Sequence, residues 1–346
     1  MSGRKIILLV NTGTPDKPEW WHVGKYLAEF LRDRRVMDMP WLLRKIHWII
    51  VPLRTPVATK RYKKVWTDEG SPLSSNLTKL VGKIRGLLSD DYTVMGAMNY
   101  GNPSVANVLN DVRKLSPEKI MALPLFPHYA SSCAGSINVN VMRTLSRWPV
   151  IPEVHLLTQF YSHPAFIEAL VAKILEYDIN SYDHILFSYH GLPVKHLSKA
   201  CSGANCGECI SSGSLPSGCK NICYRMNCYD TTALIAARLG LNEEMFSTAF
   251  QSRFHTQWIE PFTDKVLIQL LGVGKRKVLI VTPSFVSDCL ETIIEIGEEH
   301  KEMFLSVGGE KFDLVQCLND SDKWAEAVIK IIEEQSTTNC LSRTTT

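Results

Sequence analysis

The sequence predicts an α/β protein made of two similar halves that face each other across a cleft. Short apolar runs of strand length recur along the 346 residues and alternate with helical patterns, as in a parallel sheet with crossover helices. The predicted strands are 6–10, 92–97, 120–125, 154–158, 184–188, 278–282 and 312–316, and helical patterns cover 105–115, 164–177, 231–239 and 322–334. With 45% hydrophobic residues, a chain of this length can bury a large core, and the length favours two domains.

The division between the two halves is predicted near residues 147–153. We therefore expect an N-terminal α/β domain over residues 1–150 and a C-terminal α/β domain over residues 151–320. A final helix and tail over residues 321–346 are expected to pack back on the N-terminal domain.

Composition and charge exclude several classes of protein. The net charge is only +3, and no basic patch or reading motif indicates a nucleic-acid partner. The apolar run at residues 6–10 is too short for a signal peptide, and no run approaches the eighteen residues of a membrane span. We expect a cytoplasmic protein, in which reduced cysteines bind metal more often than they form disulfides.

The segment from about 38 to 66 departs from the alternating pattern. It combines apolar and aromatic side chains, Trp41 and Trp48 among them, with a dense set of lysines and arginines. Such a segment could form a lip that contacts a flat apolar ligand or the surface of a bilayer. The alternative is an ordinary helix that packs on the sheet and has a solvated basic face.

A candidate site follows the strand that ends at His190. An apolar run without polar alternation is typical of a strand buried on both faces, and in parallel sheets ligands bind beyond the carboxyl ends of the strands. Gly191 leaves room beside the histidine ring, and Pro193 ends the strand. From this stretch alone, His190 is either a functional residue or a structural histidine that closes the strand.

A cysteine cluster comes directly afterwards, in residues 201–228. Cys206 and Cys209 are separated by two residues, a spacing that lets two thiolates meet one metal, so four of the cysteines could hold a [2Fe-2S] centre or a structural zinc. The six cysteines of this insertion are Cys201, Cys206, Cys209, Cys219, Cys223 and Cys228. Cys206 and Cys209 are the firmest candidates and Cys201 the weakest, but the four ligands stay undetermined.

An acidic helix is predicted after the strand at 278–282. At 100° per residue, its carboxylates fall within roughly one 100° stripe. They are Asp288, Glu291, Glu295, Glu298 and Glu299. The stripe is either a solvated acidic face or a track of oxygen ligands that passes a divalent cation to His190 and Glu291.

Motifs over nearly the whole chain resemble those of one enzyme family. They lie at residues 10–15, 30–34, 53–56, 70–73, 99–103, 123–129, 187–193, 250–253 and 287–291. In their order and spacing they resemble the ferrochelatases, which insert ferrous iron into a porphyrin as the last step of haem synthesis. The resemblance implies two Rossmann-like domains of the chelatase type, each with a parallel four-stranded sheet flanked by helices.

The resemblance also implies roles for individual residues. His190 matches the histidine that takes pyrrole protons or contacts the metal, and Glu291 matches the carboxylate opposite it. Glu295 and Glu299 match an acidic ridge that is partly wound as a π-helix, and Asp288 precedes this ridge. The residues that match or border the porphyrin cleft are Thr12, Tyr100, Ser132 and Trp258.

The same resemblance implies partners for this protein and shows where its sequence departs from the family's motifs. The implied substrates are protoporphyrin IX and ferrous iron, with peripheral contact to the inner membrane through the lip at 38–66 and contact to the preceding porphyrinogen oxidase. Cys289 stands where many members have a histidine, and Thr12 and Asn99 stand where animal members have methionine and arginine. The cysteine insertion resembles that of bacterial members with an internal [2Fe-2S] segment.

Two other functions are compatible with the sequence. One is the same metal insertion into coproporphyrin III, and the other is a non-catalytic haem or iron-sulfur sensor on the same fold. The presence of both His190 and Glu291 favours an enzyme, because a binder would not need the pair.

Overall fold

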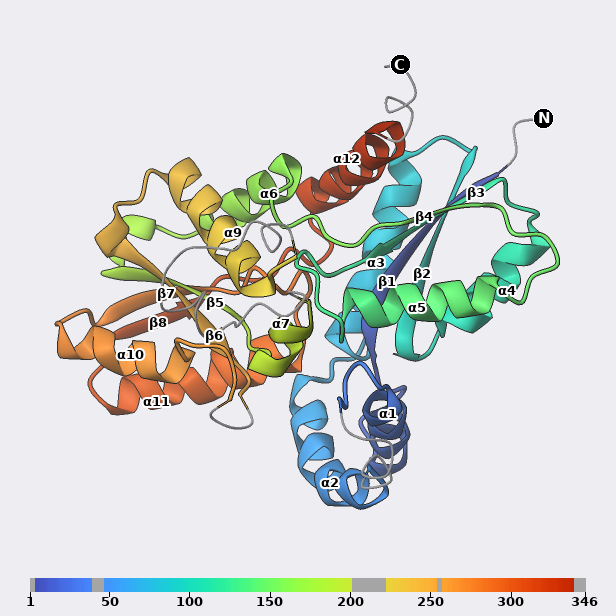
Figure 1. The fold of residues 1–346 in the computed structure, drawn as a ribbon. Coiled ribbons are helices and arrows are strands. Elements are labelled where there is room, and N and C mark those ends of the chain that lie inside the picture. Colours follow the sequence, from blue (N-terminus) through green and yellow to red (C-terminus); the bar gives the residue numbers. More distant parts are fainter. Residues whose placement is uncertain (1–3, 39–46, 201–221, 254–256, 339–346) are drawn as a thin grey trace. The chain divides into compact units, whose positions relative to one another are not determined.

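The computed structural model describes residues 4–38, 47–200, 222–253 and 257–338 (Figure 1). The chain divides into two compact units. Unit 1 comprises residues 1–160 together with 319–346, and unit 2 comprises residues 161–318. Each unit contains one four-stranded sheet in which every neighbouring pair of strands is parallel, as the fold prediction required.

The sheet of unit 1 has the strand order β2-β1-β3-β4. Its strands are β1 (Lys5–Thr14), β2 (Tyr92–Gly101), β3 (Lys119–Pro124) and β4 (Glu153–Leu156). β1 is central and buried on both faces, which explains its unbroken apolar run. Because β4 pairs with β3, the chain leaves unit 1 only after β4, about ten residues later than the predicted division.

Helices cover both faces of this sheet. On one face, α4 (Val105–Lys114) and α5 (Ala134–Leu145) pack against Ile6, Leu8 and Val10. On the other, α3 (Pro72–Leu87) packs against β1 and β2, and α12 (Asp322–Thr338) packs against α3 (Figure 1). Trp324 of α12 is fully buried in unit 1, so the last helix of the chain belongs to the same core as the first strand.

The sheet of unit 2 has the order β6-β5-β7-β8. Its strands are β5 (His184–His190), β6 (Phe246–Gln251), β7 (Lys277–Val281) and β8 (Lys311–Leu314). β6 escaped the sequence analysis because Ser247, Thr248 and Gln251 interrupt its apolar pattern, although Thr248 and Gln251 are buried. These buried polar side chains are hydrogen-bonded to Thr232, in a helix beside the sheet, and to Ser188 of β5 respectively.

The helices of unit 2 also form two layers. α6 (Pro164–Ile174) and α9 (Tyr224–Leu239) pack together, and α9 lies against β6. The opposite layer contains α10 (Thr263–Gly272), the π-helix η4 (Glu291–His300) and α11 (Lys301–Ser306), whose apolar side chains share a core with Leu186 and Val278. The short helix α7 (Val194–Ala200) follows β5.

The remaining described elements include two longer helices and two short 3₁₀-helices. In unit 1, α1 (Trp20–Arg32) packs against α2 (His47–Val65), which lies in the predicted lip. In unit 2, the 3₁₀-helices are η2 (Ile179–Ser181) and η3 (Glu243–Met245). None of the helices in the described ranges is both long enough and apolar enough to cross a bilayer.

Candidate active site

His190 is the last residue of β5, a central strand of the unit 2 sheet. Its ring Nδ1 lies 2.6 Å from the Gly191 carbonyl oxygen, and its backbone N–H donates to Ser284 Oγ at 3.0 Å. A carbonyl oxygen can only accept, so Nδ1 carries the proton and Nε2 keeps its lone pair in the neutral ring. The strand end and these two contacts therefore orient the half-buried ring, whose Nε2 is the nitrogen that can accept a proton in the neutral form.

Two aromatic rings lie next to this histidine. The ring centroids of Trp258 and Phe285 are 6.4 Å and 6.1 Å from that of His190. Trp258 is 8% exposed and pairs with Pro193 in an isolated bridge, and the neighbouring Ile259 N–H donates to the Leu192 carbonyl. The segment that carries Trp258 is thus hydrogen-bonded to residues 192–193, which directly follow His190 and Gly191.

Gly191 makes this arrangement sterically feasible. A Cβ atom at this position would lie 2.6 Å from the Gln251 carbonyl oxygen and 3.2 Å from the Trp258 ring. The sequence analysis expected this room to lie beside the His190 ring, whereas the structure places the Trp258 ring next to Gly191. The need for glycine here comes from close approach of neighbouring groups.

Glu291 begins the π-helix that follows β7, the neighbour of β5 in the sheet. Gln251, the partner of His190 in the β5–β6 register, points its side-chain Nε2 toward the Glu291 carbonyl at 3.5 Å. His190 and Glu291 therefore both lie beyond the carboxyl edge of one sheet, connected through Gln251. A nitrogen base and a half-buried carboxylate at such an edge are suited to proton transfer and metal binding.

The acidic helix differs from the expected stripe because it is a π-helix, so the α-helical spacing of 100° per residue does not apply. Glu295 is held by Ser252: the Ser252 N–H and Oγ donate to Oε1 and Oε2, each at 2.6 Å. Asp288 Oδ1 instead accepts from the Cys317 backbone N–H at 3.3 Å, after β8. These two carboxylates thus bind to segments that follow opposite edge strands of the sheet.

The end of the π-helix is more open. Glu298 is half-buried, Glu299 is exposed, and His300 Nδ1 lies 2.6 Å from the Glu295 carbonyl oxygen. Among the described residues, no three His, Cys, Asp or Glu side chains are grouped closely enough to hold a metal ion.

In unit 1, Tyr100 lies at the corresponding carboxyl edge of its sheet, near the end of β2. Its hydroxyl donates to Asp33 Oδ2 at 2.7 Å and lies 3.0 Å from Ser136 Oγ, and its ring meets Phe30 edge-on. Burial raises the pKa of Tyr100 above its usual value; the hydrogen bond to Asp33 adds to this effect, and the contact with Ser136 opposes it. The phenol is therefore a fixed, neutral part of this edge.

Thr12 and Ser132 lie at the same edge of unit 1. Thr12 is half-buried near the end of β1, next to Gly13, where a Cβ would lie 1.8 Å from the Tyr100 carbonyl oxygen. Ser132 is half-buried in the connection from β3 to α5, beside Cys133. The four residues predicted to line the porphyrin site thus divide between the units, three in unit 1 and Trp258 in unit 2.

The described part of the predicted lip is the helix α2. Four of its large apolar side chains are strongly exposed, namely Trp48 (62%), Ile49 (62%), Leu53 (72%) and Val57 (63%). The Arg32 guanidinium lies 4.8 Å from the centre of the Trp48 ring. An ordinary helix buried in the core would not expose four such side chains.

Only two cysteines of the insertion fall within the described residues. Cys223 is buried at the N-terminus of α9, and Cys228 is fully buried within it. Burial, with the nearby Cys223 contributing, raises the pKa of the Cys228 thiol well above its usual value. Cys201, Cys206, Cys209 and Cys219 lie outside the described residues.

Several supporting residues were missed by the sequence analysis. Gln251, Ser252 and Ser284 contact His190 or the π-helix, and Tyr224 Oη donates to the His190 carbonyl at 2.7 Å. Gln251 and Ser252 belonged to a quoted motif but received no role. The hydroxyls of Ser284 and Tyr224 contact the backbone of His190, and neither residue belongs to a motif that could have pointed to this contact.

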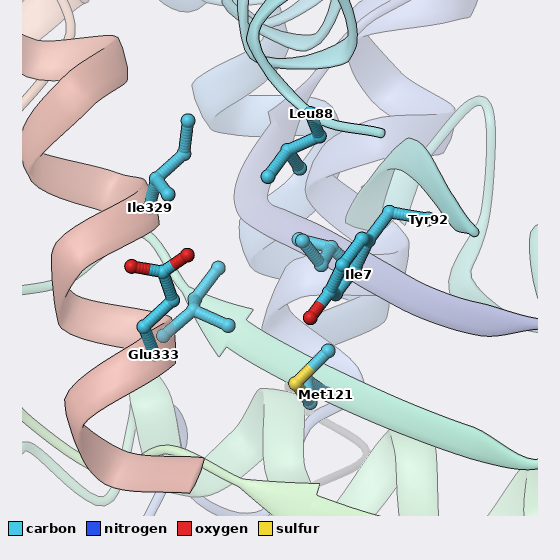
Figure 2. A pocket seen from close by; sticks show the side chains of 7 residues that line it. Ile7, Leu88, Tyr92, Met121, Ile329 and Glu333 are labelled. Carbon is cyan, nitrogen blue, oxygen red and sulfur yellow. The ribbon is translucent and has the colours of Figure 1, made fainter. Parts of the chain in front are cut away.

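A pocket of about 380 Å³ lies elsewhere in unit 1, between α12 and the sheet (Figure 2). It is lined by Ile7, Leu88, Tyr92, Met121, Ile329, Ile332 and Glu333. Ile7 and Tyr92 belong to the first half of their strands, so this pocket lies toward the end of the sheet opposite Thr12 and Tyr100. It is separate from the candidate active site.

Comparisons with known proteins identify the family of this chain. The family model "Ferrochelatase" matches residues 4–336. The chain is 39% identical to a ferrochelatase of Legionella pneumophila (strain Corby), covering 96% of this chain and 99% of the relative. It is 38% identical to one of Coxiella burnetii (strain Dugway 5J108-111), covering 95% and 93% respectively.

Among solved structures, the fold is similar to that of the sirohydrochlorin chelatase SirB from Bacillus subtilis subspecies spizizenii in complex with cobalt. The TM-score is 0.56 at 10% identity, covering 96% of this chain and 94% of that chain. This likeness supports the chelatase-like fold, and the sequence relatives support an enzyme over a non-catalytic sensor. The chain belongs to the ferrochelatase family, the porphyrin metal chelatases that insert iron in haem synthesis.

Proposed function

We propose that this ferrochelatase inserts Fe²⁺ into protoporphyrin IX and that His190 is its principal base. The reaction replaces two pyrrole N–H protons by one Fe²⁺, so a base must take protons from the macrocycle. The observation that carries this assignment is the contact of His190 Nδ1 with the Gly191 carbonyl oxygen, which makes Nε2 the proton-accepting nitrogen of the neutral ring. Bending of the macrocycle would bring its pyrrole nitrogens closer to the transition-state geometry.

Glu291 is proposed as the carboxylate that works with His190 on protons and the metal. Its position at the first residue of the π-helix, one strand away from β5, supports this role. Asp288, Glu295 and Glu299 are proposed to guide Fe²⁺, for which carboxylate oxygens are suitable ligands. Thr12, Tyr100, Ser132 and Trp258 are proposed to contact the porphyrin.

Anaerobic incubation with Fe²⁺ and each porphyrin tests the proposal, with loss of the free-base spectrum as the measurement. We expect His190→Ala and Glu291→Gln each to lower kcat by 100-fold or more, in line with the loss of a general base. Glu302→Gln, which changes an exposed carboxylate on α11, is the matched control and should leave kcat unchanged. Unchanged turnover in His190→Ala would overturn the site assignment.

The choice of porphyrin is tested in the same assay. Protoporphyrin IX should give a higher kcat/KM than coproporphyrin III, which carries two additional carboxylates. The proposal rests on the resemblance to protoporphyrin-using bacterial members. The reverse preference would assign the enzyme to the coproporphyrin reaction.

We also propose that α2 contacts the surface of an anionic membrane. Its exposed Trp48, Ile49 and Leu53 are accompanied by the basic residues Arg54 and Lys60, and this combination suits an interface of acyl chains and acidic headgroups. In co-sedimentation with phosphatidylglycerol vesicles, Leu53→Glu should weaken binding, whereas Val150→Glu, at another exposed apolar residue, should weaken it less.

Contact with the porphyrinogen oxidase and a cytoplasmic location stay predictions.

A [2Fe-2S] cluster in the cysteine insertion is proposed as well, with Cys206, Cys209, Cys219 and Cys223 as the preferred four ligands. Thiolate ligation at Cys223 is compatible with its place at a helix N-terminus, which favours negative charge. Cys228 fits less well, because full burial disfavours its thiolate. Such a cluster would supply a rigid crosslink for the insertion and a group sensitive to iron supply.

The ligand assignment is tested by visible absorption with iron and sulfide counts. Cys223→Ser should abolish the cluster, and Cys228→Ser should retain it. Stoichiometric zinc without sulfide would replace the cluster by a zinc site. Variants that lose the cluster but keep folding, iron affinity and activity would exclude the sensing and structural role.

A further inference from the structure

The pocket between α12 and the sheet of unit 1 has one wall made by strands. Ile7 pairs with Met121 in the register of β1 and β3, and Tyr92 pairs with Lys5, two residues before Ile7. Side chains at such positions point to the same face of a sheet. Ile7 and Met121 are only 1% and 2% exposed, so these two side chains form a buried, apolar floor.

The facing wall is the side of α12 that carries Ile329, Ile332 and Glu333. Their i, i+3 and i+4 spacing places them on one side of the helix. Leu88, directly after α3, completes the lining. Figure 2 shows Glu333 and Tyr92 on opposite sides of the pocket, and a carboxylate and a phenol are the polar side-chain groups among its lining residues.

The size and the lining of this pocket are typical of a site for a small organic molecule. Such sites have volumes of roughly 300–1,000 Å³ and combine mostly apolar walls with a few polar groups. This pocket has a volume of about 380 Å³, and protein interiors contain few voids larger than a water molecule. Its lining is therefore better explained by a ligand than by ordinary packing.

The charge of the lining selects the class of ligand. Among the described residues that line the pocket, Glu333 alone carries a charge, and its exposure lets an ammonium group bind there while it stays partly hydrated. Tyr92 and Met121 offer contacts to an apolar or aromatic body. Lys5 Nζ lies 5.3 Å from the centre of the Tyr92 ring, so one positive charge beside the sheet wall opposes a cationic ligand.

We propose that this pocket binds a small aromatic or branched-alkyl amine, with the ammonium group at Glu333 and the apolar part between α12 and the sheet. The site is separate from the candidate active site and does not depend on the proposed function. Its ligand contacts three strands and the last helix of the chain together. Binding therefore stabilises the packing of α12 on unit 1 by mass action.

Benzylamine is the probe for this site, with benzyl alcohol and benzoate as comparisons of similar shape. In calorimetric titration of the full-length protein, benzylamine should bind about fivefold more tightly than benzyl alcohol, as expected for an exposed ion pair, and benzoate should bind most weakly. Glu333→Gln should remove this advantage. Glu326→Gln, at an exposed carboxylate of α12 outside the pocket, should keep it. Lys5→Gln should tighten benzylamine binding, because it removes the opposing charge.

The methyl resonance of Met121 shows where the ligand binds. In protein with isotopically labelled methionine methyl groups, this resonance, assigned through Met121→Leu, should shift as benzylamine saturates the site. Ile329→Trp places a larger side chain in the pocket and should abolish both the binding and the shift. No binding of benzylamine, equal affinity for benzoate, or binding without a Met121 shift would each overturn the proposal. Binding that appears only after removal of residues 339–346 would assign the pocket to the end of the chain itself and would also overturn it.

Discussion

At the scale of single residues, Gly191 shows how closely the groups around His190 are packed. The Cβ of Gly191→Ala would lie 2.6 Å from a backbone oxygen, which cannot move without shifting β6 or the Trp258 segment. We expect iron insertion to fall at least tenfold and the free energy of unfolding to decrease by about 1–3 kcal/mol, the usual cost of overpacking. Activity and urea unfolding measure the two effects.

Gly82→Ala is the matched control for this substitution. Gly82 lies in the middle of α3, and a Cβ there meets nothing within 4 Å. Alanine should stabilise the helix by about 0.5–1 kcal/mol and leave activity unchanged. If Gly191→Ala behaved like this control, the close approach of Trp258 and Gln251 would have no functional importance.

His184, at the start of β5, makes stability depend on pH. It is 3% exposed, with its Nε2 2.8 Å from Ser247 Oγ and its Nδ1 3.0 Å from Lys275 Nζ. Burial, followed by the charge of Lys275, lowers the pKa of His184 to about 4. Below pH 6.5 the unfolded chain therefore binds a proton that the folded chain does not, and stability falls as the pH decreases.

The expected loss between pH 6.5 and 4 is up to about 1.4 kcal/mol per pH unit from this residue. Urea unfolding at several pH values measures it. His184→Gln should be less stable at pH 7 but should show a flatter pH dependence. Burial lowers the pKa of His128 to about 3, so that histidine should account for part of the slope that remains. An equal slope in His184→Gln and the parent would contradict the prediction.

At the scale of elements, α9 connects the cysteine insertion to His190. Tyr224, the first residue of α9, follows Cys223 and donates its hydroxyl to the His190 carbonyl at 2.7 Å. Tyr224→Phe removes this bond, whose net contribution is about 1 kcal/mol. We expect a severalfold lower kcat for iron insertion, because the end of β5 loses a fixed partner, and no change in the visible spectrum of the cluster proposed for the insertion.

The spectrum distinguishes this effect from damage to the insertion. Tyr229→Phe is a suitable control, since its hydroxyl is only a weak acceptor from Arg225 at 3.4 Å within the same helix. It should keep the parent kcat. A loss of kcat in Tyr229→Phe equal to that in Tyr224→Phe would point to a general change in α9.

How far the sequence specifies the fold can also be seen in particular elements. β1 and β5 were predictable because central parallel strands are buried on both faces and have apolar runs. β6 was not, because its polar residues find hydrogen-bond partners that only the folded chain supplies. Likewise, the motif placed Glu295 in the acidic ridge, but its contact with Ser252 depends on an uncommon backbone conformation. The sequence therefore predicts which residues belong to the site more readily than it predicts the contacts that hold them in place.

At the scale of the whole molecule, the chain passes between the units twice, after residue 160 and after residue 318. Unit 2 is therefore continuous, whereas unit 1 needs the last helix of the chain. α12 brings buried apolar side chains to unit 1, and Trp324 lies 5.7 Å from the Phe160 ring. Over residues 322–334 of this helix, the buried residues are Trp324, Ala325, Ala327, Val328, Ile331 and Ile332.

Separate expression of the units tests this division. Burial of each large apolar side chain contributes about 1.5–3 kcal/mol, so loss of α12 removes an amount comparable to the 5–15 kcal/mol of a whole domain. We expect residues 161–318 to unfold cooperatively on their own and residues 1–160 to lack a cooperative transition, as measured by circular dichroism during heating. Residues 1–160 joined through a Gly/Ser linker to 319–338 should regain that transition, with Trp324→Ala in this chimera costing about 3–5 kcal/mol. Cooperative unfolding of residues 1–160 alone, at the same temperature as the chimera, would show that α12 is only an accessory to unit 1.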